Sequence, residues 1–149
     1  TNMNELLYLK DEQIKEFIEK IYFAYRESFS DPIKALNNHS IGFAHHKVIH
    51  LLSIYDDITI SELLKKLKIT KQSLNRVLND LTKIGFIFFE KDKKDSRFKH
   101  IHLTEKGQKF FDEIFSIQKK RIYKALINSN SKEVLHFNNV IKRIIDEKI

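Results

Sequence analysis

The chain has 149 residues, of which 42% are hydrophobic and 32% are charged, and its formal net charge is +7. This composition is typical of one soluble globular domain and excludes a disordered chain, and no apolar run approaches the roughly 18–20 residues of a membrane-spanning helix. The absence of cysteine excludes disulfides, thiolate metal sites and cysteine nucleophiles, and the three glycines lie too far apart to form a phosphate-binding loop.

Two helices are predicted in the first third of the chain. Apolar and aromatic residues at helical spacing predict a helix over 11–28. Pro32 and the polar run 37–40 indicate a break, after which Ser40 is a candidate N-cap for a helix that ends at about Tyr55.

Two short helices come next. The stretch TISE at 59–62 is typical of a capping box with Thr59 as the N-cap. A second N-cap candidate, Thr70, opens a helix to about Ile84, and Gly85 suits the left-handed position that ends it.

The second half of the chain begins with a strand pattern. Residues 86–90 are aromatic and β-branched and residues 97–103 alternate, which predicts a β-hairpin around an exposed, charged loop. A long helix is predicted from Thr104 to about Asn128, and Ser131 is a candidate cap for the last helix.

The expected fold class is mainly α with a small antiparallel β-wing, a winged helix-turn-helix flanked by N- and C-terminal dimerisation helices. Two short helices followed by a hairpin form such a module, and its second helix lies in the major groove of DNA. We expect a single domain over 1–149, with the winged helix-turn-helix at 40–104 and helical dimerisation parts at 1–39 and 105–149. The flanking helices carry more apolar residues than the winged part can cover; the alternative is that they pack only against one another.

The polar face of the helix over 70–84 suits contact with DNA. Its amides can read adenine, its arginine can read guanine, and its first turn can contact phosphate. The alternative is a solvated face without a partner, which any amphipathic helix has. The candidate recognition-helix residues are Thr70, Lys71, Gln72, Ser73, Asn75, Arg76 and Asn79.

The excess positive charge lies in the same part of the chain. Residues 65–100 contain eleven lysines and arginines against four aspartates and glutamates, which accounts for the whole net charge of +7. Such a concentration favours a surface that binds a polyanion. The candidate wing residues are Lys93, Lys94, Asp95, Arg97 and Lys99.

A short signature closes the hairpin. Asp95 and Arg97 are followed, after five residues, by Leu103 and Thr104, and the stretch ISELLKKLKITKQSLNRVLNDLTKIGFI precedes them. Over roughly 58–107 these motifs resemble the multiple-antibiotic-resistance regulator (MarR) family of bacterial transcription factors.

The resemblance implies a homodimer that binds double-stranded DNA and represses transcription. Two recognition helices would enter successive major grooves of a pseudo-palindromic operator, and a small-molecule effector of unknown identity would release the DNA. Arg97 would be the wing arginine that enters a minor groove, and Asp95 the acid that orients it. A carboxylate can hold a guanidinium through two hydrogen bonds; the alternative is an incidental exposed ion pair.

Other interpretations stay open. His46 and His50 have the i, i+4 spacing of metal ligands, which would make the protein a metal-responsive regulator; packing or exposure near a helix start is the alternative. His100 and His102 on the wing are expected to contact phosphate or water. A winged-helix module that binds RNA or protein is another alternative. We expect no enzyme activity and no cofactor, and, because the first residues lack a signal-peptide pattern, a cytoplasmic protein.

Overall fold

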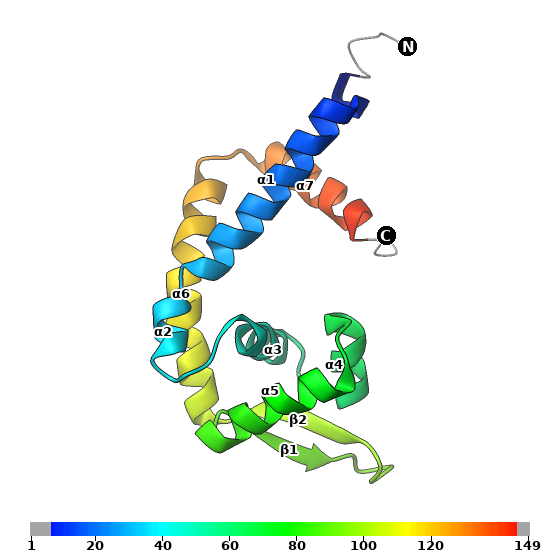
Figure 1. Cartoon of the computed structure of the whole chain (residues 1–149), viewed down its shortest axis with the longest axis vertical. Helices are drawn as coiled ribbons and strands as arrows, with labels where there is room; N and C mark the ends of the chain where they lie inside the picture. Colours follow the sequence, from blue (N-terminus) through cyan, green and yellow to red (C-terminus); the bar gives the residue numbers. More distant parts are fainter. Residues whose placement is uncertain (1–6, 146–149) are drawn as a thin grey trace.

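The computed structural model describes residues 7–145 (Figure 1). The outermost residues of the predicted dimerisation parts, 1–6 and 146–149, lie outside the described residues. The elements in chain order are α1 (Asp11–Ser30), α2 (Ile33–Asn37), α3 (Phe43–Ile54), α4 (Ile60–Leu67), α5 (Lys71–Ile84), β1 (Ile87–Lys91), β2 (Lys99–Leu103), α6 (Glu105–Ile127) and α7 (Ser131–Ile144).

The elements form two parts, joined by the long helix α6 (Figure 1). The winged part consists of α3, α4, α5 and the antiparallel hairpin β1–β2. The helical part consists of α1, α6 and α7, and α1 and α7 lie at the end of the molecule opposite the hairpin. The predicted fold class, mainly α with a small antiparallel β-wing in a winged helix-turn-helix with flanking helices, is therefore confirmed. No helix of the described chain is long and apolar enough to cross a membrane.

The hydrophobic core lies in the winged part and against the first half of α6. In the hairpin Phe89 pairs with Ile101, whose backbone N–H also donates to the carbonyl of Ile58 at 2.9 Å. The turn between α3 and α4 therefore lies along the free edge of β2. The largest fully buried apolar side chains are Leu36, Ile49, Ile58, Leu63, Leu74, Leu81, Phe86, Ile101 and Ile114.

The predicted caps of α4 and α5 are confirmed. The hydroxyl oxygens of Thr59 and Thr70 accept hydrogen bonds from backbone N–H groups three residues later, at 3.2 Å and 3.1 Å. Gly85 ends α5 with φ +84°, a left-handed conformation that glycine adopts without steric strain.

Two other predicted caps are wrong. Ser40 has φ +58° in the turn after α2, and the helix that it was expected to cap begins at Phe43, with Gly42 as its N-cap. The last helix is capped by Asn130, which forms a reciprocal capping box with Glu133. Asparagine and serine are both good caps, and neighbouring candidates differ only in backbone conformation, which composition does not encode. Helix α2 was not predicted because five residues are too few to show a period.

The start of α6 is joined tightly to the end of α5. The Thr104 hydroxyl donates to the carbonyl of Gly85 at 2.6 Å and accepts from the N–H of Gly107, while Lys106 Nζ donates to the carbonyl of Ile84 at 2.7 Å. These bonds satisfy the carbonyls that the end of a helix leaves without partners. They also fix the direction in which the hairpin leaves α5.

Candidate nucleic-acid interface

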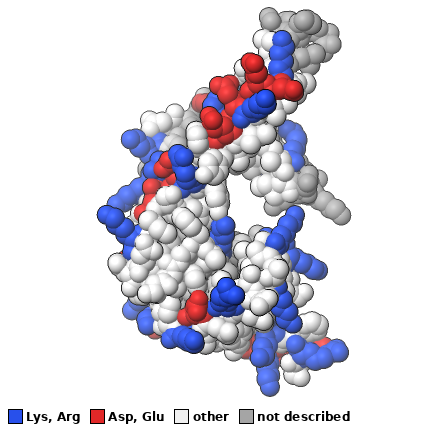
Figure 2. Space-filling model, in the orientation of Figure 1, with Lys and Arg blue, Asp and Glu red and all other residues white. Residues whose placement is uncertain are grey.

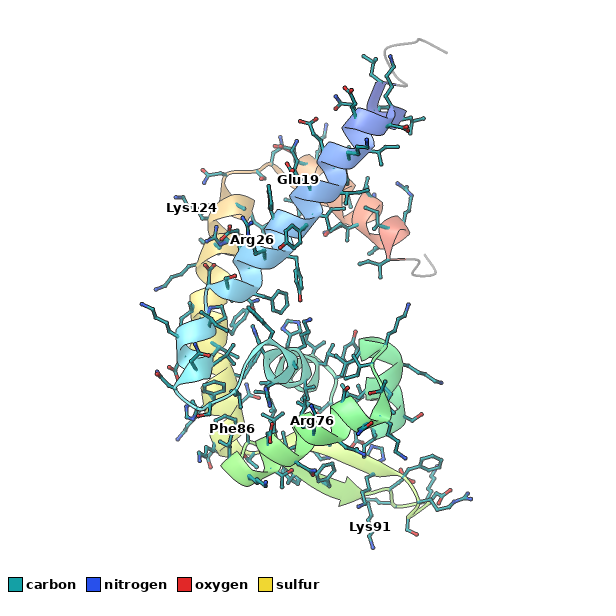
Figure 3. The ribbon with its side chains drawn as sticks, in the orientation of Figure 1. Glu19, Arg26, Arg76, Phe86, Lys91 and Lys124 are labelled. Carbon is teal, nitrogen blue, oxygen red and sulfur yellow. The ribbon has the colours of Figure 1, made fainter. Side chains whose placement is uncertain are left out.

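Helix α5 presents its polar face to solvent because its apolar face is buried in the core. Leu74, Val77, Leu78 and Leu81 are all at most 6% exposed. Figure 3 labels Arg76, which comes from α5 in the winged part. All the predicted recognition-helix residues are exposed: Thr70, Lys71, Gln72, Ser73, Asn75, Arg76 and Asn79.

Two of these residues also build the start of the helix. The Thr70 hydroxyl accepts from the Ser73 N–H and donates to Ser73 Oγ at 2.9 Å. Ser73 Oγ is the acceptor in that second bond, so its own hydroxyl proton stays available for an outside acceptor such as phosphate.

A histidine that the sequence analysis did not assign ties α5 to α3. The N–H of Gly42 donates to His45 Nδ1 at 3.1 Å, and His45 Nε2 lies 2.9 Å from an Asp80 carboxylate oxygen. This arrangement suits the tautomer with its proton on Nε2, which donates to Asp80. Asp80 is therefore engaged with α3, and the bond helps to set the angle of α5.

The predicted Asp95–Arg97 pair is present in the wing. Arg97 Nε donates to Asp95 Oδ1 at 3.0 Å, and Arg97 Nη2 donates to Asp95 Oδ2 at 2.7 Å. The Arg97 side chain is 84% exposed and that of Asp95 29%. The hydrogen bonds from the Arg97 side chain lower the pKa of the Asp95 carboxyl, and a hydrogen bond from the Arg97 backbone N–H lowers it further. The pair places a charged, outward-facing guanidinium in one orientation.

A second aspartate folds the wing loop. Asp92 Oδ2 accepts from the backbone N–H groups of Lys94 at 3.0 Å and Asp95 at 2.9 Å, and Asp92 Oδ1 lies 2.8 Å from His100 Nε2. His100 Nδ1 in turn lies 2.6 Å from the backbone carbonyl of Asp57. The loop is thus connected through β2 to the turn that follows α3.

These contacts favour the protonated form of His100. Both of its ring nitrogens face oxygen acceptors, which requires a proton on each, and the Asp57 carbonyl and the Asp92 carboxylate raise its pKa. The expectation that His100 contacts phosphate or water is therefore wrong, and His102 Nε2 is also buried. The role of Asp57, Asp92 and His100 in folding the wing was not predicted from the sequence; only the spacing of Asp92 from the following backbone N–H groups is a local signal of this turn.

Basic side chains surround the wing. Lys93, Lys94 and Lys99 are exposed, and Figure 3 shows Lys91 at the end of β1 that meets the loop. In the view of Figure 2, lysine and arginine are spread over the hairpin and the neighbouring helices, whereas acidic side chains gather on α1 at the opposite end. The surface near α5 and the wing is therefore positively charged, as the sequence predicted.

Of the two histidines proposed as metal ligands on α3, His46 is a core residue and His50 is half-buried. His46 is fully buried, its ring centroid lies 5.1 Å from that of Phe29, and neither ring nitrogen has a hydrogen-bond partner in the described chain. Burial first, and the nearby His50 second, lower the pKa of His46 to about 4. Within residues 7–145 no third His, Asp or Glu completes a metal-ligand cluster with His46 and His50.

Comparison with known proteins agrees with this geometry. The model of the MarR family matches residues 39–97. The chain is 38% identical over 141 residues to the HTH-type transcriptional regulator PetP of Rhodobacter capsulatus, covering 95% of this chain and 85% of the relative. This relative is a transcription regulator, which confirms the prediction that the chain is not an enzyme.

Solved structures share the fold. A MarR transcriptional regulator from Methanosarcina mazei Go1 matches with a TM-score of 0.70 and 26% identity, over 88% of this chain and 95% of that chain. A mutant MarR from E. coli, complexed with operator DNA, matches with a TM-score of 0.66 and 21% identity, over 93% and 97%. On the identity to the curated relative and the match to the family model, the chain belongs to the MarR family of helix-turn-helix transcription regulators.

Proposed function

We propose that this chain is a sequence-specific double-stranded DNA-binding repressor that acts as a homodimer on a pseudo-palindromic operator. The observation that carries the proposal is the combination of an exposed, amide-rich face on α5 with a wing whose single arginine is held by a carboxylate. Operator DNA in the complex of the E. coli relative, which has the same fold, supports the choice of ligand.

In this proposal α5 lies in the major groove. Gln72 and Asn79 donate to and accept from adenine, and Arg76 donates to guanine. Lys71 and Ser73, in the first turn, contact phosphate, where the helix dipole favours a negative charge.

The wing reaches the neighbouring minor groove. The bonds to Asp95 use Nε and Nη2 of Arg97, so the donors on Nη1 stay available for acceptors on the groove floor. Lys93, Lys94 and Lys99 add phosphate contacts that strengthen binding to any sequence. Residues 40–104 thus serve as the DNA-binding part.

In this proposal the helical part forms the dimer interface, which brings a second recognition helix to the operator. Neither α1 nor α7 buries a single residue within the described chain, although both carry apolar stripes. Exposed apolar surface of this extent is typical of an interface, and a second copy of the chain has the matching stripe. The exposed apolar residues are Ile14, Phe17, Ile18, Ile21, Tyr22, Phe23 and Tyr25 on α1 and Leu135, Phe137, Val140 and Ile144 on α7.

Repression and effector release are the finer parts of the proposal. A repressor can block a promoter simply by occupying DNA there. Binding of the dimer to its operator is therefore enough for repression in this proposal. An effector acts by favouring a dimer geometry in which the two copies of α5 do not match the operator. The metal-responsive alternative at His46 and His50 is supported by their buried nitrogens without hydrogen bonds, and zinc binding that is lost in a His46→Ala/His50→Ala variant tests it.

Selection of bound duplexes from random DNA tests the central proposal. We expect a pseudo-palindrome whose half-sites lie about one helical turn apart, and repression of a reporter placed behind that site. Competition with single-stranded RNA at equal salt provides the contrast. A preference for RNA, or no enriched DNA sequence, would contradict the proposal.

A further inference from the structure

A cluster of three metal-binding side chains lies at the base of the wing. Asp57 comes from the turn after α3, Glu90 from β1 and His102 from β2, and one ligand atom of each lies within 4.8 Å of the others. The group lies on the hairpin face opposite Ile101. No role in DNA binding or in the core accounts for this juxtaposition of two carboxylates and an imidazole.

The imidazole of His102 is aimed at the cluster. Its Nε2 atom is buried, although the side chain as a whole is 20% exposed, and it makes no hydrogen bond within residues 7–145; it lies 3.4 Å from Asp57 Oδ1. The ring stacks on Phe88, with centroids 5.1 Å apart, and this contact restricts its rotation. A buried ring nitrogen without a partner is costly unless something else bonds to it.

The separation of the ligand atoms suits a metal ion better than a hydrogen bond. A hydrogen bond between these groups would measure about 2.7–3.2 Å. Two ligands at about 2.0–2.2 Å from a tetrahedral ion lie about 3.3–3.6 Å apart, which includes the observed 3.4 Å. The Glu90 carboxylate lies within 4.8 Å of both other ligand atoms and moves closer when it joins them at an ion.

The two carboxylates of the cluster also favour a cation. Asp57 and Glu90 place two negative charges close together at a base of the wing that is otherwise surrounded by lysines. Within the described chain neither Asp57 nor Glu90 forms an ion pair with a lysine or arginine. A divalent ion would relieve the repulsion between the two carboxylates.

We propose that Asp57, Glu90 and His102 bind one divalent transition-metal ion, for which Zn²⁺ is the best match. One imidazole and two carboxylates are ligands of Zn²⁺, and of Mn²⁺ with lower affinity, whereas Mg²⁺ and Ca²⁺ prefer oxygen alone. Three protein ligands leave a coordination position for water.

The bound ion regulates the wing. It joins the α3–α4 turn to both strands of the hairpin. In the same turn, the Asp57 carbonyl contacts His100, and His100 contacts Asp92 in the loop that carries Arg97. Metal binding therefore restrains the wing and strengthens DNA binding. This consequence rests on the proposed function; the site itself does not.

Equilibrium dialysis of the full chain, first freed of metal by a chelator, tests the site. We expect about one Zn²⁺ per chain, weaker binding of Mn²⁺ and none of Mg²⁺. Asp57→Asn, Glu90→Gln and His102→Gln should each weaken Zn²⁺ binding at least about tenfold, whereas the control His50→Gln should not. Asparagine tolerates the left-handed conformation of Asp57, at φ +64°, so the first variant keeps the turn.

Two readouts separate the possible outcomes. In NMR spectra the ring signals of His102 should change on addition of Zn²⁺ while those of His46 and His50 do not. No Zn²⁺ binding, or binding that survives the three variants and is lost in His50→Gln, overturns the site. Zn²⁺ should also tighten DNA binding by the wild type but not by Asp57→Asn. If Zn²⁺ binds and leaves DNA affinity unchanged, the regulatory role is wrong; if the protein binds Zn²⁺ but no DNA, only the proposed function fails.

Discussion

At the scale of single residues, the wing depends on aspartates that position other groups. Asp95 removes one positive charge from a surface that attracts phosphate, so on charge alone it weakens DNA binding. In the proposed function, its hydrogen bonds to the Arg97 guanidinium compensate by limiting the rotamers of an otherwise exposed side chain. Asp92 likewise uses one carboxylate to hold the loop backbone and His100 together.

We predict that Asp95→Ala weakens operator binding by a factor of about ten, although it makes the wing more positive. The reason is the loss of a fixed direction for the Arg97 guanidinium. Fluorescence anisotropy with the selected duplex measures the effect. Glu105→Ala removes the same charge from a side chain that is 89% exposed and serves as the control. Unchanged or tighter binding by Asp95→Ala would identify the pair as an incidental surface contact.

The buried His46 makes stability depend on pH in the acid range. Its pKa in the folded protein, about 4, lies below the ordinary value of 6.5, so the unfolded chain binds a proton first as the pH falls. The free energy of unfolding is therefore unaffected by this group above about pH 6.5. It falls as the pH is lowered towards 4, by up to about 3 kcal/mol for this group.

Urea unfolding at pH 7 and pH 4.5, at one fixed protein concentration, checks this prediction. His46→Leu, of similar volume, should lose less stability between the two pH values than the wild type, because the leucine has no proton to gain. An equal loss in both proteins would show that other groups determine the acid response.

At the scale of elements, α5 and the wing loop are expected to contribute different kinds of binding energy. We predict that Arg76→Ala lowers affinity for the selected site by about 1–3 kcal/mol and relaxes base preference at one position. Lys93→Ala or Lys94→Ala should weaken binding to every sequence and reduce the slope of log affinity against log salt by about one. Binding to specific and random duplexes at several salt concentrations distinguishes these effects. Identical behaviour of the Arg76 and Lys93 variants would refute the division of roles.

The junction of α5, β1 and α6 explains the residues that follow the wing arginine. Leu103-Thr104-Glu105-Lys106-Gly107 resembled a family signature in the sequence, and the structure shows that it has a structural task. Thr104 and Lys106 bond the last carbonyls of α5, and Gly107 lets α6 approach the backbone of Phe86.

Gly107→Ala is predicted to destabilise the protein by about 1–3 kcal/mol or more, since the added Cβ atom would lie 2.0 Å from the carbonyl oxygen of Phe86. Gly42→Ala is the matched control, because a Cβ atom there meets nothing within 4 Å. Thermal or urea unfolding compares the two variants. Equal stabilities would mean that α6 can shift without loss.

At the scale of the whole molecule, the two parts differ in how they bury their apolar residues. The winged part has a closed core, whereas α1 and α7 leave their stripes exposed along the described chain. Arg121 joins α6 to the end of α1 through two hydrogen bonds to Asp31, at 2.7 Å and 3.0 Å. These polar contacts hold the base of α1, while the apolar stripe on the rest of the helix stays exposed within the described chain.

We predict that Ile18→Asp disrupts the homodimer, because it places a charge in the centre of the α1 stripe. Sedimentation at micromolar concentration should give twice 17.8 kDa for the wild type and a single chain for the variant. Glu16→Gln, on the opposite face of α1, should leave the mass unchanged. A wild-type mass of 17.8 kDa under these conditions would argue against the dimer.

Local features of this protein were readable from its sequence. The caps of α4 and α5, the end of α5 at Gly85 and the Asp95–Arg97 pair all depend on residues at most a few positions apart, and short-range backbone geometry determines them. The hairpin was readable from the composition and alternation of its two strands. The apolar spacing of the longer helices likewise predicted the fold class. Neighbouring cap candidates, such as Ser131 and Asn130, could not be distinguished in this way.

Tertiary structure alone decided which distant side chains meet. The contact between Asp57 and His100 spans 43 positions in the chain, and His45 and Asp80 meet across 35. Such pairs follow from how the α3–α4 turn lies along β2 and how α3 crosses α5, which depend on the packing of the whole core. The polyanion-binding face was indicated by the sequence because its charges lie close together along the chain. The burial of His46 and the cluster of Asp57, Glu90 and His102 depend on core packing and are therefore seen only in the folded chain.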